Sequence, residues 1–345
     1  MDPLTQGTLG ASLPQACLDR RHAASAGLLG FLAGMAADLD VLIRSSTDPL
    51  LFLEYHRQFT HSLIFIPVGG LLCALLLHQL FGRRRGLSFR QSWLFCTLGY
   101  ATHALLDACT TYGTMLLWPF SDQRFAWNTI SIIDPLFTLP LLLGVVMTAR
   151  KKRHLYVRLA LLWAFSYMVL GLWQRNTAVD MGYALAAERG HEPLRLEAKP
   201  SFANILVWKI VYETGDRYYV DAVRARVAPR VFPGDSVEKL NIARDMPWLD
   251  LASQQARDIE RFRWFSNGYI ARDPIYRNRV IDIRYSLIPN EVDPLWSIEL
   301  RPGAAREEHA AYRVHRDTGG NRIGTMWSMV TGSQASRPAA ASFSP

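Results

Sequence analysis

The first half of the chain alternates long apolar segments with short polar connections. Each apolar segment carries few or no formal charges, and most are about as long as a helix that crosses a bilayer. The pattern predicts an all-α polytopic membrane bundle of about five spans over residues 1–174. The predicted spans are residues 23–37, 62–81, 92–109, 130–148 and 155–173.

The segments differ in how clearly they fit a span. Residues 62–81 run for twenty positions without a formal charge, which is typical of a membrane helix. Residues 23–37 are short and rich in small side chains, so two interpretations stay open for them. They form either a span or a re-entrant, tightly packed helix.

Positive charge between the spans predicts their orientation. Basic clusters occur at residues 20–21, 83–85 and 150–153. Cytoplasmic connections carry an excess of Lys and Arg, and five spans alternate without conflict if all three clusters are cytoplasmic. The C-terminal half then lies outside the cytoplasm.

The second half has the composition of a soluble domain. Charged residues occupy 45 of its 171 positions, compared with 23 of the first 174, and about a quarter charged is typical of soluble domains. Its alternating and helical patterns predict a small α+β domain over residues 175–330, followed by a disordered tail at 331–345. The expected elements are a hairpin of residues 203–213 and 217–227, a helix at 248–264, and strands at 279–287 and 295–301.

Overall charge and cysteine content exclude several classes of protein. The net charge of +8 is spread over both halves, so neither is a strongly basic nucleic-acid binder. The four cysteines include no CxxC pair, which argues against a zinc–thiolate site and a disulfide framework.

A small set of ionisable residues lies within or beside the predicted spans, where charge is costly and commonly functional. The orientation drawn from the basic loops alone places all of them near the non-cytoplasmic ends of their segments. They are Asp38, Asp40, His56, His61, His103, Asp107 and Asp134.

These side chains form a nitrogen and oxygen ligand set. His103 and Asp107 are four residues apart and share one face of a helix. Imidazole and carboxylate ligands suit Zn, Mn or Fe, and the set is large enough for two metals about 3.5–4 Å apart that clamp a phosphoryl group. Arg57 is the candidate to hold a phosphate oxygen, and Asp40 or Asp134 to act as general base.

Simpler interpretations exist for each group. An intramembrane His-x3-Asp pair also forms interhelical hydrogen bonds or proton relays. Asp-Leu-Asp at a helix end is commonly a solvated turn, and Asp134-Pro135 fits the start of a helix. The motifs one by one therefore leave the choice open.

Their order along the chain resembles a known family. The motifs are Met1-Asp2-Pro3-Leu4-Thr5, Ala37-Asp38-Leu39-Asp40, His56-Arg57-Gln58-Phe59-Thr60-His61-Ser62, His103-x3-Asp107 and Ile133-Asp134-Pro135. Together they resemble the bacterial inner-membrane family described as membrane-bound metal-dependent hydrolases, some of them LexA-regulated. The resemblance covers about residues 1–150. It implies that Asp38, His56, His61, His103 and Asp107 are metal ligands, with Asp40 and Asp134 as second choices.

One position departs from that family. Many members begin with Asp-x-x-Thr-His, and this chain has Gln6 where the histidine stands. Either that histidine is not an essential ligand, or this chain binds one metal less tightly.

The sequence thus predicts a metal-dependent hydrolase of the bacterial inner membrane, with membrane lipids around it and a lipid-linked or periplasmic phosphoester as substrate. Two alternatives from other classes are a metal or proton transporter and a non-catalytic envelope scaffold.

Overall fold

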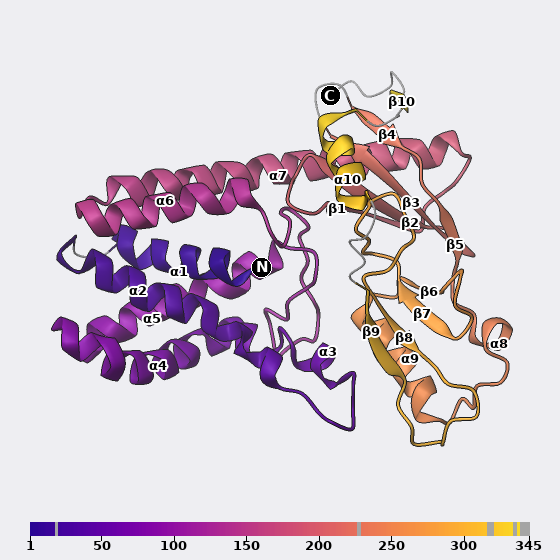
Figure 1. Ribbon diagram of the computed structural model, residues 1–345, viewed down its shortest axis with the longest axis horizontal. Coiled ribbons are helices and arrows are strands. Elements are labelled where there is room, and N and C mark those ends of the chain that lie inside the picture. Colours follow the sequence, from indigo (N-terminus) through magenta and orange to yellow (C-terminus); the bar gives the residue numbers. More distant parts are fainter. Residues whose placement is uncertain (18–19, 226–228, 316–320, 334–336, 339–345) are drawn as a thin grey trace. The chain divides into compact units, whose positions relative to one another are not determined.

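The computed structural model describes residues 1–17, 20–225, 229–315, 321–333 and 337–338. The chain folds into two compact units, shown in Figure 1. The first unit comprises Met1–Ile43, Tyr55–Leu172 and Phe202–Asn204; the second comprises Arg44–Glu54, Trp173–Ser201 and Ile205–Pro345. Most of the predicted disordered tail lies outside the described residues.

The first unit is built from helices that run alongside one another (Figure 1). The longest, α7, begins in this unit and ends in the second. The helices are α1 (Pro3–Cys17), α2 (Ala23–Met35), α4 (Ile66–Leu77), α5 (Phe89–Ala108), α6 (Pro135–Lys151) and α7 (Leu155–Glu188).

Short helical turns extend two of these helices. Turns lie at both ends of α2 and at both ends of α4. The turn Phe59–His61 comes shortly before the turn that leads into α4. The turns are the 3-10 turns Arg20–His22, Ala36–Leu42, Phe59–His61, Leu63–Phe65 and Arg83–Arg85, and the π-helical turn His78–Gly82. Asp38 and His61 lie in two of these turns, outside the regular α-helices.

Within the described residues, three helical stretches are long and apolar enough to cross a membrane: Arg20–Leu42, Leu63–Arg85 and Leu155–Glu188. They correspond to three of the five predicted spans, 23–37, 62–81 and 155–173. The other two predicted spans correspond to helices α5 and α6, which are not among the three. The lower apolar content of α5 and the late start of α6 at Pro135 account for the difference.

Helix α1 was not among the predicted elements, although it packs against α2, α5 and α6. Glycines allow this close packing, because a Cβ atom added at Gly30 would meet the backbone carbonyl of Gly10. One added at Gly99 of α5 would likewise meet Gly30. Small residues permit such approach between helices in membranes, where lipid offers no hydrophobic drive for association.

The second unit contains two antiparallel sheets. In the first, β1–β2–β3–β4–β10 are neighbours in that order and β5 also pairs with β3; the second has the order β6–β7–β8–β9. The strands are β1 (Arg195–Pro200), β2 (Val207–Glu213), β3 (Arg217–Arg224), β4 (Arg230–Phe232), β5 (Ser236–Glu238), β6 (Ile270–Arg272), β7 (Arg279–Asp282), β8 (Trp296–Glu299), β9 (Ala311–Val314) and β10 (Arg337–Pro338).

Helices and apolar side chains complete this unit. Val211, Val220 and Ile281 belong to one core cluster with strands from both sheets, and Met329 of α10 packs in a second cluster with Phe232. The helices are α3 (Leu51–Tyr55), α8 (Ile242–Asp245), α9 (Gln254–Phe265) and α10 (Arg322–Thr331), besides the end of α7.

The predicted α+β character of this half is confirmed, including the hairpin, whose strands are β2 and β3. The predicted helix at 248–264 begins later, at Gln254, because Ser253 caps it by accepting a hydrogen bond from the Ala256 amide. Strands at 279–287 and 295–301 are present but shorter, as β7 and β8. Strands β1, β4, β5, β6, β9 and β10 were not predicted.

Candidate metal centre

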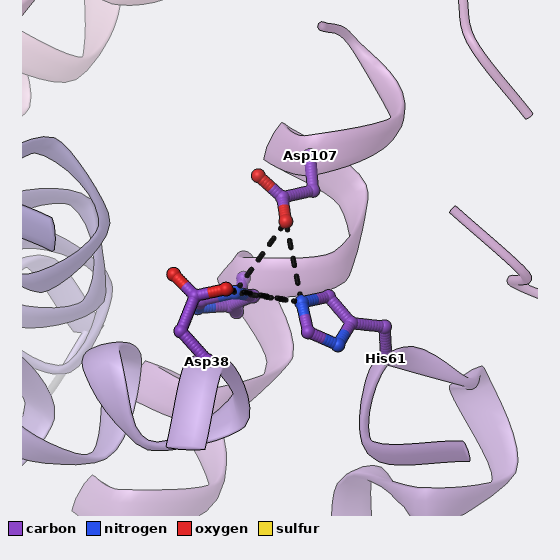
Figure 2. Close-up of side chains that lie close together, drawn as sticks. Asp38, His61 and Asp107 are labelled. Carbon is purple, nitrogen blue, oxygen red and sulfur yellow. Dashed lines mark hydrogen bonds and ion pairs between the residues drawn. The ribbon is translucent and has the colours of Figure 1, made fainter. Parts of the chain in front are cut away.

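Four of the predicted ligands converge in the first unit. Asp38 comes from the 3-10 turn that follows α2, and His61 ends the turn Phe59–His61. His103 and Asp107 project from one face of α5, as their spacing predicts. Figure 2 shows the Asp38, His61 and Asp107 side chains pointing toward one another. One potential ligand atom from each of the four lies within 4.8 Å of all the others.

The distances between these atoms are short. The Nε2 atoms of His61 and His103 are 3.0 Å apart. Asp38 Oδ1 lies 3.5 Å from His61 Nε2 and 3.4 Å from His103 Nε2. Asp107 Oδ2 lies 3.2 Å from His61 Nε2 and 3.6 Å from His103 Nε2. Two nitrogens and two oxygens therefore surround one point.

This spacing fits a tetrahedral metal. Metal–ligand bonds of about 2.0–2.2 Å place the ligands of a tetrahedron about 3.3–3.6 Å apart. Asp107 Oδ2 is buried and accepts no hydrogen bond from the described residues, although Arg57 Nε is 3.0 Å away as an ion-pair partner. A cation bound at this point would satisfy this oxygen and both imidazole nitrogens at once.

The far sides of both imidazoles are held in place. His103 Nδ1 is hydrogen-bonded to the backbone carbonyl of Gly34. His61 Nδ1 lies 2.9 Å from Thr60 Oγ1 and 3.2 Å from Asp40 Oδ2. Partners of this kind orient metal-binding histidines and leave the other nitrogen for the metal.

Asp40 and His56 form a neighbouring group. Asp40 Oδ1 lies 2.7 Å from His56 Nδ1, and Asp40 Oδ2 accepts hydrogen bonds from the Arg57 amide and Thr60 Oγ1. Asp38, Asp40 and His56 also have potential ligand atoms within 4.8 Å of one another. Asp38 is common to both groups, so the arrangement offers a second, smaller cluster beside the first.

Burial shapes the electrostatics of the cluster. His61, His103 and Asp107 are fully buried, whereas the Asp38 side chain is 23% exposed. Burial alone would lower the pKa of His61, but its contacts with Asp107, Asp38 and Asp40 outweigh it and raise the pKa to about 10. The buried carboxylates thus favour a positive charge at this position, either a proton or a metal ion.

Arg57 is buried beside the cluster. Its guanidinium lies against Asp107 and over the Tyr112 ring, and Nη1 donates to Thr110 Oγ1. Its backbone has a φ of 64°, which non-glycine residues seldom adopt and which is common at functional sites. Asp107 therefore neutralises part of the positive charge of Arg57, the residue predicted to bind phosphate.

Gln6, the departure from the family motif, lies in the cluster's surroundings. Its Nε2 donates to Asp107 Oδ1 at 2.8 Å, and the Met1 amino group pairs with the same oxygen. Gln6 therefore fixes the carboxylate whose other oxygen faces the histidines. No role was predicted for Gln6 or Thr60, although Thr60 lies within the motif His56-Arg57-Gln58-Phe59-Thr60-His61-Ser62.

Asp134 lies elsewhere. It caps α6 by accepting hydrogen bonds from the amides of Leu136 and Phe137, and Tyr167 donates to its carboxylate at 3.0 Å. It belongs to neither group of potential metal ligands among the described residues. These contacts match the simpler interpretation of Asp134-Pro135 as a helix start.

Comparison with known proteins shows which proteins the first half of the chain resembles. A family model described as YdjM inner membrane protein matches residues 1–178. The chain is 34% identical over 152 residues to the inner membrane protein YbcI of Escherichia coli (strain K12), covering 43% of this chain and 82% of that protein. No solved structure matches the chain. Neither description names a metal or a reaction, and the family match spans every residue of the cluster. The chain therefore belongs to the YdjM inner membrane protein family.

Proposed function

We propose that this inner membrane protein is a metal-dependent hydrolase that acts on a phosphoester. Asp38, His61, His103 and Asp107 hold the first metal ion, and Asp38, Asp40 and His56 provide a place for a second. The observation that carries the proposal is the spacing of the four converging ligand atoms, five of whose separations are 3.0–3.6 Å. Zn fits this donor set best, with Mn or Fe as alternatives.

The pattern of exposure supports a catalytic site more than a closed structural one. Structural zinc sites are closed by four protein ligands, as many as the first group offers, whereas catalytic sites keep a position open to water or substrate, so it is the exposure of the ligands that favours catalysis here. Asp38 and His56, with side chains 23% and 17% exposed, are the accessible ligands, and the remaining ligands of the first group are buried. Substrate would approach from the side of Asp38 and His56.

Residues around the cluster would orient its ligands and balance their charge. A divalent metal in this cluster supplies Lewis acidity toward a phosphoryl oxygen and a more acidic water. Arg57 partly neutralises Asp107 and keeps positive charge beside the cluster. Asp40 has both oxygens engaged with His56, Thr60 and His61, so it orients the histidines. Of the two residues predicted as general base, Asp40 thus lies nearer the ligands, and Asp134 starts α6.

The membrane arrangement is part of the proposal. We infer that α5 and α6 also cross the membrane, giving five spans in a membrane domain over residues 1–174 and a domain at 175–330 outside the cytoplasm. Leu139 and Leu143 on α6 and Leu94 on α5 are exposed apolar side chains that fit a lipid environment. The orientation rests on the basic loops. A lipid-linked phosphoester would reach a site located at the ends of these helices.

Hydrolysis of a phosphodiester probe tests this function. The detergent-purified protein is freed of metal with chelator, reloaded with Zn²⁺ or Mn²⁺, and assayed with bis-p-nitrophenyl phosphate and with a phospholipid in mixed micelles. We expect metal-dependent release of product that is lost in His103→Ala. His78→Ala is the matched control, because His78 is also buried in the first unit but bonds to Ser92.

The outcome distinguishes the competing functions. A protein that binds metal without hydrolysing the probes, and that carries metal into proteoliposomes, would be a transporter and not a hydrolase. That uptake should disappear in His103→Ala. If the protein neither binds metal nor hydrolyses the probes, the non-catalytic envelope scaffold is the function that remains.

A further inference from the structure

The segment between the ligands Asp40 and His56 belongs to the second compact unit, whereas the two ligands belong to the first. Asp38 and Asp40 precede this segment, and His56 and His61 follow it. The chain leaves the first compact unit after Ile43 and returns to it at Tyr55, so that Arg44–Glu54 is part of the second unit. A metal ligand set is thus divided by a loop that folds with a different body.

The ends of this loop are joined by the metal-site residues themselves. Asp40 Oδ1 lies 2.7 Å from His56 Nδ1, and Asp40 Oδ2 accepts the Arg57 amide at 2.9 Å. Residues 40–57 therefore form a loop closed at its base by contacts within the first unit. A displacement of the middle of the loop would therefore be transmitted along the chain to Asp40 and His56.

The middle of the loop is held by Arg261 of α9. Its guanidinium makes two parallel hydrogen bonds to Asp48, from Nη1 to Oδ1 at 2.9 Å and from Nη2 to Oδ2 at 2.8 Å. Its Nε donates to Glu54. Forked pairing of this kind fixes geometry as well as adding energy. The Arg261 side chain thus binds the loop through two carboxylates, those of Asp48 and Glu54.

Arg261 is itself fixed in place. Its Nη1 also lies 3.0 Å from Asp258 Oδ1, and Asp258 is fully buried and held by the Ala310 amide and His309. Apolar contacts support the same loop, because Leu50 and Leu53 are buried and the Phe52 ring packs edge-on against Tyr312. Arg261 is only 20% exposed, unlike a solvated surface pair.

We propose that Arg261 is a positioning residue for the metal centre, through which the second unit controls the ligands Asp40 and His56. The inference rests on the proposed metal-dependent function. It gives the C-terminal half a role: whatever binds or moves α9 changes the grip on residues 44–54 and so the affinity of the site for metal.

Metal titration of the full-length protein in detergent tests the proposal. Zn²⁺ affinity is measured by calorimetry for the wild type and for Arg261→Ala, Asp48→Asn and the double variant. We expect each single variant to weaken binding about tenfold, the size typical of residues that support metal ligands. The double variant should be no weaker than Arg261→Ala, because both substitutions remove the same contact. Asp48→Asn leaves Arg261 paired with Asp258, so it is the milder variant for folding.

Arg263→Ala is the matched control. Arg263 lies on the same helix but pairs with the exposed Glu260, and its replacement should leave Zn²⁺ affinity unchanged. Hydrogen exchange of residues 36–43 and 55–62, measured without metal, should rise in Arg261→Ala and stay at the wild-type rate in Arg263→Ala.

The results separate the two proposals. Wild-type affinity and wild-type exchange in Arg261→Ala would overturn the positioning role and leave the metal centre intact. Additive losses in the double variant would overturn it too, since the two residues would then act independently. A wild-type protein that binds no metal would refute the proposed function itself.

Discussion

Asp40 lies behind His61, with its Oδ2 atom 3.2 Å from His61 Nδ1, while Nε2 on the opposite side of the ring faces Asp107. Carboxylates in this position orient metal-binding histidines and increase their basicity, and their loss commonly reduces metal affinity about 10–100-fold. We expect Asp40→Asn to weaken Zn²⁺ binding within that range. Calorimetric titration of the purified protein measures the change.

Asp134→Asn serves as the comparison for Asp40→Asn. Asp134 caps α6 and bonds Tyr167, so its substitution should lower the unfolding temperature with little change in Zn²⁺ affinity. If Asp134→Asn weakens metal binding as much as Asp40→Asn does, the structural role given to Asp134 is wrong.

A second prediction concerns the packing of α1 against α2. Gly30→Ala places a methyl group against the Gly10 carbonyl and the Pro14 ring, and a backbone atom has little room to shift. Overpacking of this kind costs about 1–3 kcal/mol of unfolding free energy. Thermal unfolding in detergent should show a clear fall in Tm. Gly215→Ala, where an added Cβ meets nothing within 4 Å, should leave Tm close to the wild-type value.

A third prediction follows from Lys209, which is buried in β2 with its ammonium group bonded to Ser286 Oγ and the Glu291 carbonyl. Burial lowers the pKa of Lys209 from 10.5 to about 7. Between these two values the unfolded chain holds the proton and the folded chain does not, so stability rises with pH across this range. Below about pH 7 the cost of burying the charge is fully present.

Lys209→Met removes this dependence. The difference in Tm between the variant and the wild type should change steadily from pH 7 to pH 10 and become constant below pH 7, because all other titrations are shared. Differential scanning fluorimetry over this range checks the result. Curves that stay parallel from pH 6 to pH 10 would show that Lys209 keeps an ordinary pKa.

The convergence of the predicted ligands was predictable where it depended on local spacing. His103 and Asp107 lie four residues apart on a helix, and α5 does place both toward the same point. The approach of Asp38 and His61 to that helix depends on two 3-10 turns, Ala36–Leu42 and Phe59–His61, which no apolar pattern reveals. Asp134 caps α6, in line with its place before Pro135, but its hydrogen bond from Tyr167 joins residues 33 positions apart and could not be predicted.

Other features were hidden for different physical reasons. Helix α1 buries polar residues such as Gln6 and Thr8, so its hydropathy does not resemble that of a membrane helix. Its packing depends on glycine contacts that only the fold brings together. Arg57 is buried and has a left-handed backbone conformation, and its residue type suggests neither feature. The short strands β4, β5 and β6 contain too few residues for alternation to be recognised.

X-ray absorption spectroscopy of the metal-loaded protein tests the central claim most directly. The account predicts a bound metal with two imidazole nitrogens and carboxylate oxygens at about 2.0–2.2 Å, loss of the bound metal in His61→Ala, and its retention in His78→Ala. Sulfur ligands from the four cysteines, or a native protein that retains no metal under these conditions, would contradict it.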